Sequence, residues 1–180
     1  MKTYTGIGSR STPLDVQALM EAYANHLAVK GWVLRSGGAE GADQAFQRGV
    51  HGGKKEIYLP WGGFNNFRHD PENGFYVAEE FGNWEEAQDI AAQLHPAWEN
   101  CGQGARRLHT RNVYQVLGQN LDRPSEALIC WAEPKGHGHV KGGTGMAVSI
   151  ARQCGVNVIN LYHTRNQEKI INIINEDLTR

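Results

Sequence analysis

The stretch from Trp32 to Asp43 reads WVLRSGGAEGAD, and it places an apolar strand, a glycine-rich turn and the first residues of a helix in direct succession. Trp32–Arg35 has the short apolar pattern of a buried strand. The glycines that follow allow a tight turn, and Ala42–Val50 continues with a helical pattern. A strand that passes through such a turn into a helix begins a β-α-β unit, which implies a parallel sheet.

The remainder of the chain alternates in the same way between short apolar segments and longer amphipathic ones. Further strands are predicted at Lys2–Ile7, Ile57–Leu59, Ala127–Trp131 and Val156–Leu161. Further helices are predicted from Thr12 (as the cap, with Pro13 in the first position) to Lys30, Asn83 to Leu94, Arg106 to Leu117, Met146 to Gln153 and Gln167 to Leu178. The sequence therefore predicts an α/β fold with a doubly wound, mostly parallel, Rossmann-like sheet of about five strands. We expect a single domain over residues 1–180, with an inserted segment around residues 61–105.

Composition narrows the class of protein. The chain has 180 residues, of which 40% are hydrophobic and 21% charged, and this suits one packed domain. Its formal net charge of -1 disfavours a surface that follows a nucleic-acid backbone. The cysteines, Cys101, Cys130 and Cys154, show no CxxC spacing, which argues against a disulfide framework or a cysteine-rich zinc site. No apolar run has membrane-spanning length and no signal segment opens the chain, so we expect a cytoplasmic protein with no membrane partner.

Glycine-bearing loops follow three of the predicted strands: GIGSR from Gly6 to Arg10, SGGAEGAD from Ser36 to Asp43, and KGGTG from Lys141 to Gly145. Because the carboxyl ends of parallel strands meet at one edge of a sheet, the three loops are expected to converge there. Each precedes a helix whose first N–H groups attract an anion, and glycine lets the backbone approach a phosphate closely. One such loop alone is more often a tight turn, but three in equivalent positions favour a nucleotide-type ligand. The P-loop and the GxGxxG dinucleotide fingerprint are absent, and no cofactor is expected.

These motifs, together with HTRN from His109 to Asn112, resemble the SLOG superfamily of Rossmann-like proteins. That superfamily includes the DNA-processing protein A family, the lonely-guy phosphoribohydrolases and a YspA-like nucleotide-sensing branch, to which GSR, GGAEGAD and RN are most similar. The resemblance spans Gly6 to Gly145 and implies a nucleotide or nucleotide-derived ligand held by the glycine loops. The ligand-binding residues that it implies are Gly8, Ser9, Arg10, Ser36, Gly37, Gly38, Asp43, Arg111, Asn112, Gly142, Gly143, Thr144 and Gly145.

One departure from the resemblance bears on catalysis. The phosphoribohydrolases carry PGGxGTxxE, whose glutamate serves N-glycosidic cleavage, whereas this chain has Lys141 at the proline and Val148 at the glutamate. Valine cannot stabilise an oxocarbenium-like centre. Asp43 is the candidate catalytic acid if the protein is a hydrolase, and capping of the helix that begins beside it is its alternative role. Glu40 and Glu133 are expected to be solvated loop acids.

The 8 histidines raise the question of a metal site. His137-Gly138-His139 is the densest pair, but the spacing specifies no third ligand, so a flexible loop is favoured and no metal is predicted. His109 is a candidate for contact with a substrate, or else a residue of a helix surface. The aromatic residues between Trp61 and Trp98 are expected to form a local core or a subunit interface rather than to stack a base.

The sequence leaves three functions open. The favoured one is a protein that binds a nucleotide or ADP-ribose-like ligand, as a sensor or to sequester it, because the catalytic glutamate is missing. The alternative is a hydrolase of a nucleotide N-glycosidic or phosphate bond. The second alternative is a single-stranded DNA-binding protein of the DNA-processing type, which the net charge disfavours. The expected partners are a nucleotide-type small molecule and, in a homo-oligomer, a second copy of the chain; nucleic acid is the less favoured partner.

Overall fold

The computed structural model describes residues 1–178, and its centre is a parallel sheet of six strands. The strands are β1 (Thr3–Gly8), β2 (Val33–Ser36), β3 (Lys55–Leu59), β4 (Phe75–Val77), β5 (Ala127–Trp131) and β8 (Asn157–Asn160). Their order across the sheet is β4-β3-β2-β1-β5-β8, and every neighbouring pair is parallel. This is the doubly wound, Rossmann-like arrangement that the sequence predicts.

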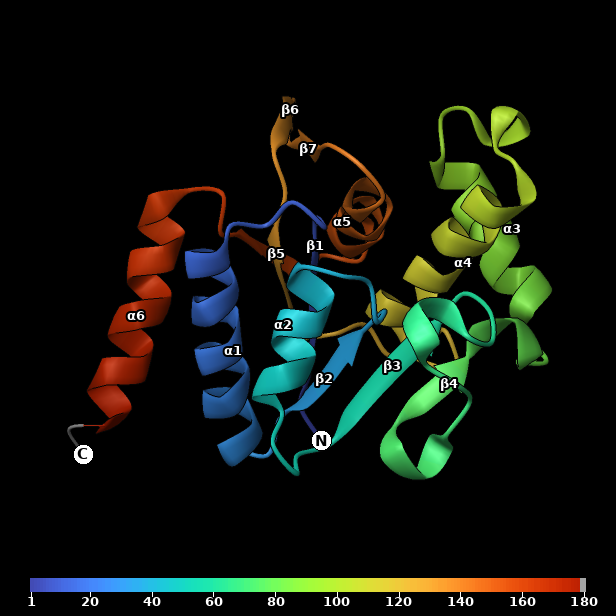
Figure 1. Cartoon of the computed structure of the whole chain (residues 1–180). Helices are drawn as coiled ribbons and strands as arrows, with labels where there is room; N and C mark the ends of the chain where they lie inside the picture. Colours follow the sequence, from blue (N-terminus) through green and yellow to red (C-terminus); the bar gives the residue numbers. More distant parts are fainter. Residues whose placement is uncertain (179–180) are drawn as a thin grey trace.

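Helices cover both faces of the sheet (Figure 1). On one face lie α1 (Leu14–Val29), α2 (Ala42–Gly49) and α6 (Thr164–Leu178). On the other lie α3 (Trp84–Leu94), α4 (Gln103–Leu117) and α5 (Thr144–Gln153). None of these helices, over the residues that the structure describes, is both long enough and apolar enough to cross a membrane.

Consecutive residues of a central strand pack into the two cores on opposite faces of the sheet. Leu128 packs in the core beneath α4 and α5, whereas the next residue, Ile129, packs in the core beneath α1 and α2. Ile57 and Tyr58 of β3 divide in the same way. Strands buried on both faces need apolar side chains at successive positions, and this explains the near-continuous apolar run of β5.

The predicted fold needs two corrections. The sheet has six strands rather than five, because the three-residue edge strand β4 pairs with β3. Thr12 does not cap α1: Pro13 occupies the N-cap position, no side chain caps the helix, and the Thr12 hydroxyl donates instead to the Ser9 carbonyl oxygen at 2.6 Å. A small hairpin of β6 (Pro134–Gly136) and β7 (His139–Val140) follows β5.

Residues 61–105 run along one edge of the sheet and then onto the α4 face. They contain β4, α3 and four short 3₁₀ helices at Phe64–Asn66, Pro71–Asn73, Ala78–Glu80 and Trp98–Asn100. The aromatic residues of this segment pack against the two cores of the domain rather than forming the separate local core that the sequence suggested. Phe81 and Trp84, for example, contact Tyr114 of α4 at ring-centroid distances of 5.1 and 6.2 Å.

Candidate functional site

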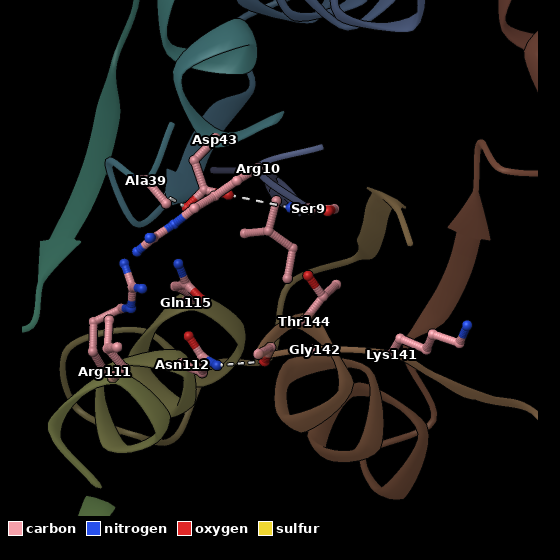
Figure 2. Close-up of a pocket in the computed structure, with 14 residues that line it drawn as sticks. Ser9, Arg10, Ala39, Asp43, Arg111, Asn112, Gln115, Lys141, Gly142 and Thr144 are labelled. Atoms are coloured by element: carbon pink, nitrogen blue, oxygen red, sulfur yellow. Dashed lines mark hydrogen bonds between the residues drawn. The ribbon is translucent and has the colours of Figure 1, made fainter. Parts of the chain in front are cut away.

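A pocket of about 330 Å³ lies where the winding of the sheet reverses. β1 and β5 are neighbours here, and the chain continues from β1 toward one edge and from β5 toward the other. Loops that leave such a pair of strands in opposite directions open a crevice between them. The lining residues, all drawn as sticks in Figure 2, are Ile7, Gly8, Ser9, Arg10, Ala39, Asp43, Leu108, Arg111, Asn112, Gln115, Lys141, Gly142, Gly143 and Thr144.

Asp43 joins the first two glycine loops. Its Oδ1 accepts a hydrogen bond from the Gly8 N–H at 3.1 Å and its Oδ2 accepts one from the Ala39 N–H at 3.4 Å. Gly41, not Asp43, occupies the N-cap position of α2, so the capping role is not what the side chain performs. Burial raises the pKa of Asp43 to about 6, against the lowering effects of Arg111 and of the backbone N–H donors. The pocket therefore contains a carboxyl group that titrates close to neutral pH.

Arg111 of α4 faces this carboxyl group from the opposite wall. Its side chain is buried, and Nη1 donates to the carbonyl oxygens of Gly37 and Tyr58. Its Nε has no hydrogen-bond partner among the described residues, although it is shielded from solvent. Burial lowers the pKa of Arg111 to about 10; Asp43 acts against this shift and Arg10 adds to it. The guanidinium is thus charged at neutral pH, and its Nε donor is unpaired among the described residues.

Arg10 brings a second positive charge to the same place. It is exposed to solvent, and Figure 2 shows its guanidinium group pointing toward that of Arg111. Two guanidinium groups that face each other repel unless an anion lies between them. Planar guanidinium groups bind phosphate and carboxylate oxygens through paired N–H donors. The two arginines therefore make an anion site on one side of the pocket.

The N-terminus of α5 supplies donors on the other side. Gly142 has a φ of 73°, Gly143 is the N-cap residue, and Thr144 begins the helix. A Cβ added to Gly142 or Gly143 would meet no atom within 4 Å, so the backbone here faces open space. The Asn112 side chain holds the turn by donating from Nδ2 to the Gly143 carbonyl oxygen at 2.9 Å. The first N–H groups of a helix lack intrahelical acceptors and favour an anion.

Four residues that the resemblance implies for the site do not line this pocket. The Ser36 hydroxyl donates to the Gly6 carbonyl oxygen at 2.6 Å, deep in the sheet. Gly37 packs directly against Arg111, and the Gly38 carbonyl oxygen accepts from the Asn65 side chain at 3.0 Å. Gly145 lies against the Val140 carbonyl and faces a neighbouring cavity. The other predicted residues come together around the pocket.

Sequence reasoning missed most of the wall that α4 contributes. Leu108 and Gln115 line the pocket beside Arg111 and Asn112. Residues 108, 111, 112 and 115 share one face of a helix, because side chains three and four positions apart are neighbours. Helical spacing around the predicted pair Arg111 and Asn112 was the signal that could have found them. Ile7, Ala39 and Lys141 complete the list of lining residues outside the predicted set.

The three histidines that the sequence analysis considered, His109, His137 and His139, line a neighbouring cavity of about 650 Å³. Lys141 and Gly142 form the wall that this cavity shares with the pocket. Burial, with His95 and Arg111 nearby, lowers the pKa of His109 to about 4, so its ring is neutral. His109 therefore lies outside the pocket, and this arrangement does not favour its contact with a ligand bound there.

No protein-family model matches the chain, and no curated protein matches it. Among solved structures, the chain is similar to DNA processing protein A from Helicobacter pylori, which is described as having a unique single-stranded DNA binding mode. The identity is 15%, the TM-score is 0.41, and the match covers 99% of this chain and 80% of the other. A likeness at this level assigns no function, so the function has to be sought in the geometry of the pocket.

Proposed function

We propose that the protein binds a nucleotide or a nucleotide-derived ligand, such as an ADP-ribose-like molecule, at the carboxyl edge of the sheet. The observation that supports this most is the convergence of Arg10, Arg111 and the α5 N-terminus on one pocket of about 330 Å³. A pocket of this size suits a small organic ligand, whose typical sites measure about 300–1,000 Å³. In this proposal the phosphate lies inside the pocket, between the α5 N-terminus at Gly142–Thr144 on one side and the two guanidinium groups on the other. The sugar and base extend along Leu108 and Ile7.

In this proposal the protein is a sensor of its ligand or sequesters it. Val148, at the position of the missing glutamate, is 1% exposed and packs in the core beneath α5. No side chain at that position therefore reaches the ligand. The glycine loops and the arginines would bind a phosphate ester in its ground state. Such contacts give affinity but do not by themselves accelerate a reaction.

Hydrolysis of the nucleotide is the second candidate, and Asp43 is the observation that favours it. Its carboxyl group lines the pocket, and with a pKa of about 6 it is poised between acid and base near neutral pH. Both of its oxygens already accept backbone N–H groups, however. A role in proton transfer would compete with the role of holding the Gly8 and Ala39 turns together.

Single-stranded DNA is the third candidate, and it would use the same anion site. The cationic side chains of Arg10 and Lys141 are exposed, so a phosphate of a longer strand could reach them from solvent. Binding to a strand through several phosphates would weaken steeply with salt. A shift assay at two salt concentrations separates this outcome from capture of a single nucleotide.

The test begins with the small molecules that the purified protein retains. Mass spectrometry after denaturation identifies a retained nucleotide, and calorimetry then measures its affinity for the stripped protein. Gly143→Val fills the open space beside the helix N-terminus, so we expect at least about 100-fold weaker binding by a chain that still folds. Gly82→Val is the matched control, because Gly82 is also exposed with nothing within 4 Å of an added Cβ, and it does not line the pocket. Unchanged affinity in folded Gly143→Val protein would overturn the proposal.

A further inference from the structure

Three side chains outside the pocket, His95, Cys101 and His109, approach one another closely. His95 follows the end of α3, Cys101 follows the 3₁₀ helix Trp98–Asn100, and His109 lies in α4. One ligand atom from each can be chosen so that all three lie within 4.8 Å of one another. The sequence did not reveal this cluster, because the residues belong to three different elements.

The spacing of the cluster suits a tetrahedral metal ion. Zinc bonds of about 2.3 Å to sulfur and 2.0–2.1 Å to nitrogen place an S and an N ligand about 3.6 Å apart. Cys101 Sγ lies 3.7 and 3.8 Å from the two ring nitrogens of His95. The rings of His95 and His109 have centroids 4.5 Å apart. Side-chain rotations that move the ligand atoms by about 1 Å would bring all three within bonding distance of one ion.

A second observation points to a missing partner. The Nδ1 atom of His109 is shielded from solvent and has no hydrogen-bond partner among the described residues. The large majority of buried polar atoms in proteins are paired, and an unpaired one calls for an explanation. The His95 ring and the Cys101 thiol lie close to the His109 ring, but no hydrogen bond joins either of them to His109. An ion bound to Nδ1 between the three side chains would supply the missing partner.

We propose that His95, Cys101 and His109 bind a zinc ion. A thiolate with two imidazoles selects Zn²⁺ over Mg²⁺ and Ca²⁺, which prefer oxygen ligands. The Cys101 thiol now donates to the Ala97 carbonyl oxygen at 3.5 Å; it releases its proton to solvent when the metal binds. Three protein ligands leave the fourth position open. His95 and His109 line the cavity of about 650 Å³ that also contains His137 and His139, and this cavity is large enough for water or a small ligand.

The first test uses metal uptake by the full chain without a histidine tag. Stripped protein is titrated with Co²⁺, which reports thiolate ligation by a charge-transfer band in the near ultraviolet, and with Zn²⁺ in competition with a chelating dye. We expect one equivalent of metal and the thiolate band. Cys101→Ser and His109→Ala should each lose the band and at least about 100-fold in affinity, because loss of a supporting residue alone costs 10–100-fold. Cys154→Ser, which changes an exposed cysteine, should bind as the unaltered protein does.

A second measurement needs no variant and so does not depend on folding. Bound Zn²⁺ should slow alkylation of Cys101 in the unaltered protein, while the exposed Cys154 in the same sample reacts at its usual rate. Absence of the thiolate band, or equal protection of both cysteines, would overturn the proposal. The double variant His137→Ala/His139→Ala should keep the band. If this variant lost the metal while Cys101→Ser kept it, the ion would belong to the β6–β7 hairpin and the cluster would not be a site. None of these readouts involves the nucleotide, so they stand or fall apart from the proposed function.

Discussion

The second and third glycine loops look alike in sequence, but their glycines meet opposite surroundings. A Cβ on Gly37 would lie 1.8 Å from Arg111 Nη1 and 2.2 Å from Gln115 Nε2, and a Cβ on Gly41 would lie 2.6 Å from the Ser9 carbonyl oxygen. A Cβ on Gly142 or Gly143 would meet nothing within 4 Å. In the second loop glycine lets side chains and backbone of the protein itself approach. In the third loop Gly142 and Gly143 leave room for something from outside, whereas Gly145 packs against the Val140 carbonyl oxygen.

This difference assigns the loops separate tasks. The second loop positions Arg111 and Asp43, because the Gly37 carbonyl oxygen accepts from the guanidinium and the Ala39 N–H donates to the carboxyl group. The third loop offers its backbone to the pocket. The glycine loops that look equivalent in the sequence therefore differ in the structure: the second loop positions Arg111 and Asp43, and the third loop faces the pocket. Substitutions in the two loops should separate stability from binding.

The substitution Gly37→Ala should produce the largest effect, which is a loss of stability. The added Cβ displaces the Arg111 guanidinium, which breaks its bonds to the Gly37 and Tyr58 carbonyl oxygens in a fully buried place. Overpacking together with a disrupted buried charge should lower the free energy of unfolding by about 4 kcal/mol. Gly143→Ala, the matched change in the third loop, should alter it by less than about 0.5 kcal/mol. Urea unfolding measures both, and equal losses would erase the distinction between the loops.

The sheet could be predicted from the sequence because strand, glycine turn and helix follow one another locally. β4 was missed, since three residues between turns carry too little pattern to mark a strand. The burial of Arg111 could not be predicted from the sequence either, because a charged residue is expected at the surface. Which face of α4 meets the glycine loops depends on how that helix packs on the sheet. Leu108 and Gln115 were missed because the packing face of α4 was not recognised, although their helical spacing from Arg111 and Asn112 was a usable signal. The cluster of His95, Cys101 and His109 was missed because these residues belong to three different elements.

The pH dependence of stability should report on Asp43, the residue that ties the first two loops together. Its pKa is raised to about 6 in the folded protein, so between about pH 4 and 6 the folded state holds a proton that the unfolded chain has released. Stability from this group is therefore present at pH 4 and is lost as the pH rises through 6. Relative to Asp43→Asn, the unaltered protein should lose up to about 3 kcal/mol between pH 4 and pH 7. A difference between the two proteins that does not change with pH would contradict this.

Substitutions of Arg10 and Lys141 should show which exposed cation of the pocket binds the phosphate group. Arg10 makes no ion pair in the described structure and points at Arg111, whereas Lys141 Nζ is paired with Glu133 at 2.6 Å. A charge-assisted contact contributes about 1.5–3 kcal/mol, so Arg10→Ala should weaken a nucleoside monophosphate by tenfold or more and the nucleoside much less. Lys141→Ala, as an exposed and already paired charge, should weaken the phosphate ligand by about threefold at most. Calorimetry with adenosine and its monophosphate decides, and equal losses for both ligands would show that Arg10 does not read phosphate.

The smallest expected effect is no turnover at all. The third loop provides helix N–H groups for a phosphate, but Val148, at the position of the missing glutamate, is turned into the core. The carboxyl group that lines the pocket, Asp43, belongs to the second loop and has both oxygens engaged by Gly8 and Ala39. Loss of a catalytic carboxylate usually costs orders of magnitude in rate, so ribo- and deoxyribonucleoside monophosphates incubated with the protein should release no free base by chromatography. Release near a typical enzyme rate of about 10 per second, abolished by Asp43→Asn, would make the protein a hydrolase whose acid has moved from the third loop to the second.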